Sequence, residues 1–241
     1  SQFLNDPDEV RHGFTHNSRV IVRYLQELIK TKLPNSELSS FLLSFLKKIV
    51  EDLIDNMNAS FFIVSFCSSG DLLSQWRSYF KNGLGISIGF DYKYLKDICL
   101  QHNLIISNVL YNDKDKEATI SKIITAAIEI AGSNQEVLNE PIYKDLFSKI
   151  IILLSLFYKD VFFKEEDECR IVQESFNPED GIFYRNGFNK LIPYIKLPLS
   201  ANLNEIKTII AGPMIDSDKL ERSIKLKYPH IHIQPSDGKL Q

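Results

Sequence analysis

The chain has little cysteine, tryptophan or methionine, with three, one and two residues respectively among 241. Its cysteines, Cys67, Cys99 and Cys169, are odd in number, widely spaced and set in apolar runs. This pattern favours reduced, buried thiols over a disulfide framework or a zinc site. Reduced thiols are typical of the cytoplasm, which is the location we expect.

Long apolar runs and a strong charge of either sign are also lacking. Even SKIIILLSLFYKD has lysines near both ends, so no membrane contact by a spanning helix is expected. The net charge of -3 provides no basic field for tight nonspecific nucleic-acid binding. The five histidines show no metal-ligand spacing, so no metal site is expected from them.

What is present is the composition of an ordinary globular protein, 44% hydrophobic and 24% charged. Turn residues at Asn5-Asp6-Pro7 predict a loop over residues 1–17. Apolar residues at helical spacing then predict two helices, the second capped by Ser36. Residues 115–160 repeat this pattern in two further helical pieces.

Short β-branched and alternating runs predict the strands. The predicted strands are FFIVSFC, LGISIGFD, LIISNVLYND, EDECRIVQES, IKTIIAGP and HIHIQPS, together with a hairpin that turns at Asn186-Gly187. Of these, FFIVSFC is predicted to be a buried central strand. Helices are predicted in LLSQWRSYF, capped by Ser69 or Asp71, in YKYLKDICLQHN and in DSDKLERSIKLKYP. The sequence therefore predicts one α+β domain over residues 1–241, with a mostly antiparallel, split β-sheet core and helical insertions at about 18–57 and 115–160.

Four consecutive acids precede an arginine in FFKEEDECRIV. If this segment is extended from Glu166, then Glu166, Glu168 and Arg170 share one face of the strand, about 7 Å apart in succession. Two readings stay open at this point. The face is either an exposed edge whose charges compensate each other, or a cleft wall where one carboxylate stabilises a developing cation and its neighbour orients it.

Other polar side chains occur within apolar segments of the sequence. Ser65 lies on the strand FFIVSFC, where a buried hydroxyl needs a partner. The segment SQWRSYF gathers Gln75, Trp76, Arg77 and Tyr79. Trp76 is interpreted either as core or as a ligand wall. An arginine on an apolar helix usually pairs with an acid or holds a phosphate, and the acids described above are candidate partners for Arg77.

Taken in order, LNDPDE, SFCSSGDLLSQWRSYFKNGLGISIGF, FFKEEDECRIV, LIPYIKLPL and IKTIIAGP resemble the bacterial domain of unknown function 2971. That family typically has an Asn-Asp-Pro-Phe-Glu motif, a Ser-Phe-Ser strand, a Gln-Trp-x-x-Tyr helix and a Glu-x-Glu-x-Arg strand. Here Asp8 stands in place of the aromatic and Cys67 in place of the second serine.

The serine strand, the aromatic-bearing helix and the Glu-x-Glu strand are also similar to elements of ADP-ribosyltransferases. This resemblance implies that NAD is the substrate, with Glu168 stabilising the oxocarbenium-like ribose, Glu166 orienting the acceptor and Arg170 balancing the charge. It further implies that Ser65 supports the ribose and that Trp76 or Tyr79 walls the pocket, with Gln75, Arg77, Asn5 and Asp6 as further cofactor-binding candidates. A first strand with an aromatic-His or aromatic-Arg pair would lie before Ser1.

The resulting expectation is an NAD-dependent toxin or phage-defence effector that modifies a protein or a nucleic acid, with an antitoxin or other defence protein as a candidate partner. Two alternatives stay open. One is a non-enzymatic sensor or interaction module in which the acids form a structural ion network. The other is a nuclease that holds a divalent ion with Asp6, Glu9 and the Glu-x-Glu acids.

Overall fold

The computed structural model describes residues 7–30, 37–55, 61–80, 84–133, 140–173, 182–187, 190–197 and 199–238. The chain divides into two compact units. Unit 1 comprises Ser1–Val64 and Ser107–Glu165, and unit 2 comprises Ser65–Ile106 and Glu166–Gln241. That both units form one domain stays a prediction.

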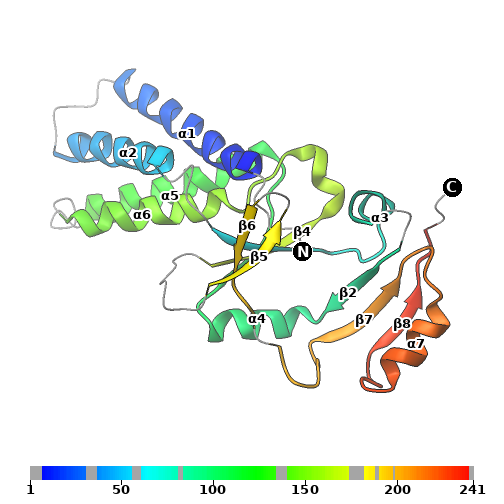
Figure 1. The fold of residues 1–241 in the computed structure, drawn as a ribbon. Coiled ribbons are helices and arrows are strands. Elements are labelled where there is room, and N and C mark those ends of the chain that lie inside the picture. The colour runs from blue at the N-terminus through cyan, green and yellow to red at the C-terminus, as the bar shows by residue number, and fades with distance from the viewer. Residues whose placement is uncertain are drawn as a thin grey trace. The chain divides into compact units, whose positions relative to one another are not determined.

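Unit 1 is a group of helices. They are α1 (Pro7–Lys30), α2 (Glu37–Asp55), α5 (Asp113–Ser133), α6 (Pro141–Ser155) and most of the short 3-10 helix η4 (Val161–Glu166). Helices α1, α2, α5 and α6 lie side by side (Figure 1). Apolar side chains at helical spacing, such as Leu42, Phe45, Ile49 and Leu53 of α2, are buried between them.

The predicted loop over residues 1–17 is wrong from Pro7 onward, where α1 already begins. Proline is well suited to the first position of a helix, because its missing N–H has no partner there in any case. The turn signal therefore marked the start of a helix. Residues 1–6 and the predicted cap Ser36 lie outside the described residues.

Helix α1 packs closely on α6 at Gly13 and Asn17. A Cβ atom on Gly13 would overlap the backbone carbonyl of Ser155. One turn further along, the buried Asn17 side chain donates to the Ile151 carbonyl at 3.2 Å and to the Ser155 hydroxyl. Glycine at this position permits the close approach, and the Asn17 side-chain NH₂ group bonds two acceptors that the approach buries. The buried Asn17 Oδ1 atom has no partner among the described residues.

Unit 2 contains most of the strands. Its elements are β1 (Phe62–Cys67), α3 (Leu73–Tyr79), β2 (Ile86–Phe90), α4 (Tyr92–Gln101), β3 (Ile105–Asn108), β4 (Glu168–Gln173), β5 (Phe183–Gly187), β6 (Lys190–Tyr194), β7 (Ile206–Ala211), α7 (Ser217–Lys225) and β8 (His232–Pro235). The boundary between the units falls inside β1 and β3. In the part of the chain that is described, the strands form three small sheets, in the orders β1-β4-β3, β2-β7-β8 and β5-β6.

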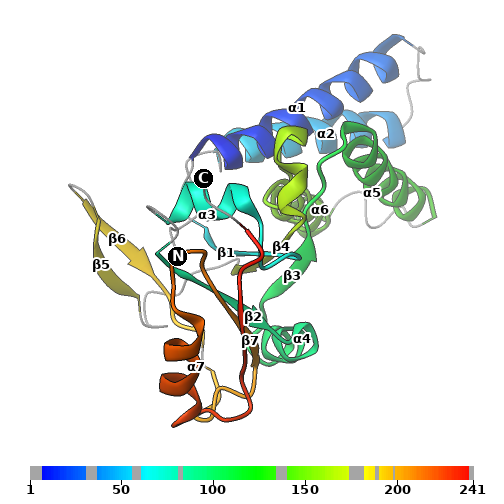
Figure 2. The ribbon, with the colours of Figure 1, turned by 90° about the vertical axis from the view of Figure 1, so that its right-hand side faces the viewer.

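The sheet β2-β7-β8 contains one core of unit 2. Strand β7 pairs antiparallel with β2 and parallel with β8, and α7 joins β7 to β8 (Figure 2). Ile206, Ile209, Ile231 and Ile233 are buried together. The alternation of apolar residues in IKTIIA and HIHI predicted these strands correctly, because one face of each is buried.

Three sequence predictions in unit 2 need correction. Strand β1 is an edge of its sheet and only half-buried beyond Phe62, whereas β4 is central. Asn186 and Gly187 are strand residues paired with Leu191 and Lys190, so they do not form the predicted turn. Ser69 and Asp71 do not cap α3, whose N-cap is Leu72 without a side-chain hydrogen bond.

The fold is thus a mixture of helices and small, mainly antiparallel sheets, as predicted. Among the described residues, no helix combines the length and the apolarity that a bilayer crossing requires.

Candidate functional site

The acids of the sequence motif meet the serine strand inside unit 2. The Glu168 carboxylate is 4% exposed, and its Oε2 atom accepts from Arg170 Nε and Nη2, each at 2.9 Å. The Ser65 hydroxyl donates to the same oxygen at 3.4 Å, although it lies 103 residues earlier in the chain. The predicted association of Ser65 with Glu168 and Arg170 is therefore present.

The sequence predicted that Glu166 and Glu168 share one face of a strand, and this prediction is wrong. Strand β4 begins only at Glu168, and Glu166 is the last residue of η4. Between them Asp167 has a φ of 41°, a left-handed conformation that is uncommon for a residue other than glycine. This conformation interrupts the strand alternation on which the shared face depended.

The strained Asp167 is held by Ser68. The Ser68 N–H donates to the Asp167 carbonyl at 3.1 Å, and its hydroxyl donates to Asp167 Oδ2 at 2.7 Å. Such backbone outliers cost on the order of 1–3 kcal/mol and occur preferentially at functional sites. The left-handed residue Asp167 directly precedes Glu168, so it helps to set the position of Glu168 at the start of β4.

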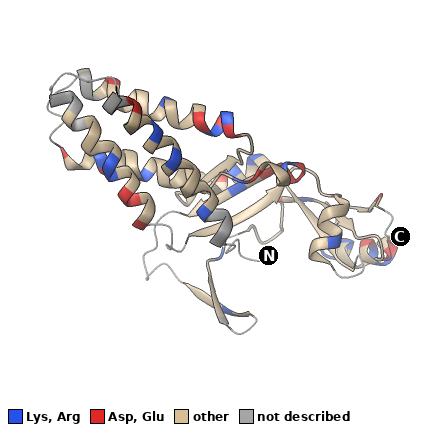
Figure 3. Ribbon diagram, turned by 90° about the horizontal axis from the view of Figure 1, so that it is seen from above, with Lys and Arg blue, Asp and Glu red and all other residues tan. Residues whose placement is uncertain are grey.

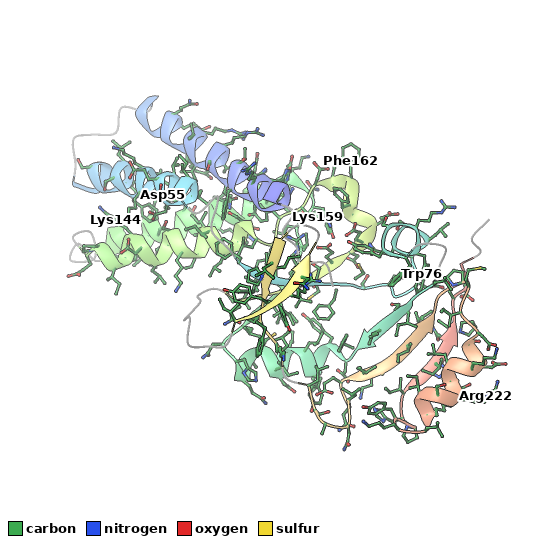
Figure 4. The ribbon with its side chains drawn as sticks, viewed as in Figure 1. Asp55, Trp76, Lys144, Lys159, Phe162 and Arg222 are labelled. Atoms are coloured by element: carbon green, nitrogen blue, oxygen red, sulfur yellow. The ribbon has the colours of Figure 1, made fainter. Side chains whose placement is uncertain are left out.

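Trp76 is a buried residue, 2% exposed, on α3 (Figure 4). Its indole Nε1 donates to Asp71 Oδ1 at 2.6 Å, and its ring lies 5.5 Å from that of Phe80. The Ser236 hydroxyl and the Asp237 N–H also donate to Asp71. Asp71 thus joins the segment before α3 to the segment after β8, a role that the sequence did not predict beyond its place in a turn.

Because of these hydrogen bonds, the contribution of Asp71 to the free energy of unfolding depends on pH. Burial raises the pKa of Asp71, but the bonds from Ser236, Trp76 and the Asp237 backbone outweigh it, so the pKa is lowered below 3.8. The stabilisation by Asp71 is complete at a pH above its pKa in the unfolded chain, and it is lost as the pH falls through its pKa in the folded chain. At pH 7 we expect Asp71→Asn to lower the free energy of unfolding by about 1–2 kcal/mol. Urea unfolding followed by Trp76 fluorescence measures this difference, which should shrink as the pH falls below 3.8; a difference that does not change with pH would contradict the charge-based account.

The other predicted cofactor-binding residues of α3 lie on its exposed or half-exposed sides. Gln75 is half-buried, whereas Arg77 and Tyr79 are exposed. The prediction that Arg77 pairs with the acids is wrong, because Arg170 occupies Glu168 and no ion pair joins Arg77 to a described residue. Asn5 and Asp6 lie outside the described residues, and so does the Glu9 side chain.

The structure also shows the surroundings of the three cysteines and of the side chains that could bind a metal ion. None of the three cysteines forms a disulfide, but the prediction of buried thiols holds only for Cys99, because Cys67 and Cys169 are half-buried. Burial raises the pKa of Cys99 and Cys169, which disfavours the reactive thiolate. Within the described residues, no group of three His, Cys, Asp or Glu side chains is placed to hold a metal ion.

A family model described as Protein of unknown function (DUF2971) matches residues 75–171. Over these residues the chain is similar to this family. The DUF2971 match runs from Gln75 on α3 to Ile171 on β4 and thus includes Trp76, Glu168 and Arg170. No curated protein and no solved structure matches the chain.

Chemically, the DUF2971 segment supplies a fixed carboxylate and a guanidinium, to which β1 adds a hydroxyl. The carboxylate can stabilise a nearby positive charge, and the low surrounding polarity would strengthen that effect. The same groups also satisfy one another, which a purely structural ion pair requires.

Proposed function

We propose that the chain is an NAD-dependent ADP-ribosyltransferase-like effector, with Glu168 as its catalytic carboxylate. The observation that carries this proposal is the hydrogen bond from Ser65 to Glu168, which unites the serine strand β1 with the acidic strand β4. The DUF2971 match across Gln75–Ile171 includes Trp76 of α3 and Glu168 of β4, while Ser65 lies before it.

The reaction breaks the bond between the ribose C1′ atom and the nicotinamide nitrogen of NAD. Nicotinamide leaves with the electron pair of that bond, and positive charge develops on the ribose. The Glu168 carboxylate stabilises this charge. An acceptor nucleophile on a protein or nucleic acid, oriented by Glu166, then bonds to C1′ and transfers its proton to the Glu166 carboxylate.

Arg170 has a positioning role in this scheme. Its Nε and Nη2 atoms both donate to Glu168 Oε2, so the guanidinium holds this carboxylate oxygen in place. Asp167, held by Ser68, fixes the backbone just before that carboxylate. A preorganised carboxylate needs no rearrangement when charge develops, which is the condition for electrostatic catalysis.

The test is release of nicotinamide from NAD, measured by chromatography with bacterial extract as the source of acceptor. Glu168→Gln keeps the shape of the side chain and removes its charge, so we expect a loss of about 100-fold or more. Glu165→Gln removes an exposed charge three residues earlier and should leave the rate unchanged. Circular dichroism of both variants separates loss of activity from loss of fold.

A silent wild-type chain with every extract would overturn the transferase proposal, and so would equal activity of wild type and Glu168→Gln. A chelator is included as a further arm. Activity on nucleic acid that disappears with the chelator would replace the transferase by a metal-dependent nuclease. If the transferase is correct, expression of the wild type, but not of Glu168→Gln, should slow bacterial growth.

The burial of the ion pair favours a second candidate function. Glu168 and Arg170 are 4% and 2% exposed, as in an ion pair that serves the fold alone. In that case the chain is a non-enzymatic sensor or interaction module of a defence system. The nicotinamide assay distinguishes the two, because a module releases no nicotinamide while Glu168→Gln still lowers its stability.

A further inference from the structure

A shallow groove of about 420 Å³ lies along α1 in unit 1, away from the residues of the proposed reaction in the sequence. We name it the α1 groove. It is lined by Thr15, Ser18, Arg19, Val22, Arg23 and Gln26 of α1, and by Ile54 near the end of α2. The α1 residues recur at helical spacing, so they form one stripe about 16 Å long.

The stripe combines a positive wall with apolar contacts. Val22 and Ile54 are 39% and 54% exposed, which is unusual for aliphatic residues of neighbouring helices. Arg19 and Arg23 are one turn apart and both exposed. No acid lines the groove itself.

Little in the described residues neutralises this charge. Arg23 reaches Glu117 at 3.2 Å, with side chains 60% and 39% exposed, and a pair this exposed is weak. Arg19 forms no hydrogen bond or ion pair with described residues. The Ser18 hydroxyl is buried and has no partner there either. Elsewhere in the chain, Lys and Arg occur interspersed with Asp and Glu along the helices (Figure 3), whereas the α1 groove places the unpaired Arg19 and the weakly paired Arg23 beside apolar groups.

We propose that the α1 groove binds an acidic amphipathic helix of a partner protein. Most of its lining residues are exposed, so it is open along its length, which suits a polypeptide segment better than an enclosed small molecule. An amphipathic helix docks with apolar residues at i, i+4 and i+7, and these would cover Val22 and Ile54. Asp and Glu beside them would meet Arg19 and Arg23, which complement them in charge.

The test selects ligands from a displayed library of helical peptides of about 18 residues, roughly 27 Å long. Peptides are selected on the wild-type chain and counter-selected on the Arg19→Glu, Arg23→Glu double variant. We expect the survivors to carry more Asp and Glu than the input library. The best survivor should bind the wild type at least about tenfold more tightly than the double variant, measured by calorimetry.

Two further variants make this test specific. Ile54→Asp removes the apolar contact from α2 and should also weaken binding. Arg222→Glu with Lys225→Glu changes the net charge by the same amount on α7 in unit 2, and should bind as the wild type does. Circular dichroism checks the folding of each variant.

Survivors without an acidic bias would overturn the proposal, and so would an equal loss of binding in the α7 control variant. Displacement of the peptide by a single-stranded RNA oligonucleotide that itself depends on Arg19 and Arg23 would reassign the groove to nucleic acid. None of these readouts uses NAD, so their outcome is independent of the transferase test.

Discussion

Replacing Arg170 by methionine should lower the free energy of unfolding of unit 2 by about 3–5 kcal/mol, the usual loss when one partner of a buried ion pair is removed. The Glu168 carboxylate would stay 4% exposed but lose two bonds of 2.9 Å. The Ser65 bond of 3.4 Å to the same oxygen is too long to compensate for them. Urea unfolding followed by fluorescence reports on unit 2, because Trp76 is the one tryptophan of the sequence.

The double variant Glu168→Met, Arg170→Met separates pairing from packing. Since apolar replacement of both partners is often nearly neutral, we expect the double variant to recover most of the lost stability. Arg222→Met on α7, an exposed position (Figure 4), should change it by less than about 0.5 kcal/mol. A single Arg170→Met variant as stable as the wild type would show that the pair contributes little to the fold.

Replacing Gly13 by alanine should lower the stability of unit 1 by about 3 kcal/mol, at the upper end of the range for overpacking. Helix propensity alone predicts the opposite sign, because alanine is favoured over glycine in a helix by about 1 kcal/mol. The new Cβ would lie 2.8 Å from the Ser155 carbonyl carbon and closer still to its oxygen. Because backbone cannot rotate away as a side chain does, α1 and α6 must separate and strain the Asn17 bonds.

Far-ultraviolet circular dichroism in urea measures this effect, since most helical residues belong to unit 1. Thr125→Ala is the matched control, because Thr125 is exposed on α5 of the same unit and only the propensity term applies there. It should be neutral or stabilising by a few tenths of a kcal/mol. If Gly13→Ala is also stabilising, the close contact between α1 and α6 does not exist in solution.

Local patterns predicted the elements well where one face is buried. The Leu42, Phe45, Ile49 and Leu53 stripe of α2 and the alternation in β7 and β8 are of this kind. Element boundaries were predicted poorly where a residue type serves two roles. Pro7 begins a helix as readily as it ends a turn.

The candidate site was predicted in part for the same physical reasons. The sequence predicted that Ser65 and Glu168 lie near one another, and the half-buried Ser65 hydroxyl does donate to the buried Glu168 carboxylate, although this bond itself was not predicted. The position of Glu166 was not predictable from alternation, because the left-handed Asp167 breaks the strand. Asp71 was missed since its donors, at Ser236 and Asp237, lie 165 residues and more away in the chain.

The Asp71 contacts also bear on the order in which the protein matures during translation. The ribosome synthesises residues 71 and 76 long before residues 236 and 237, so nascent Trp76 has its carboxylate partner while that carboxylate still lacks two of its donors. Strand β8, the parallel neighbour of β7, emerges just before these donors. Completion of unit 2 therefore follows synthesis of its final strand, whereas every residue of unit 1 has been synthesised once the chain passes Glu165.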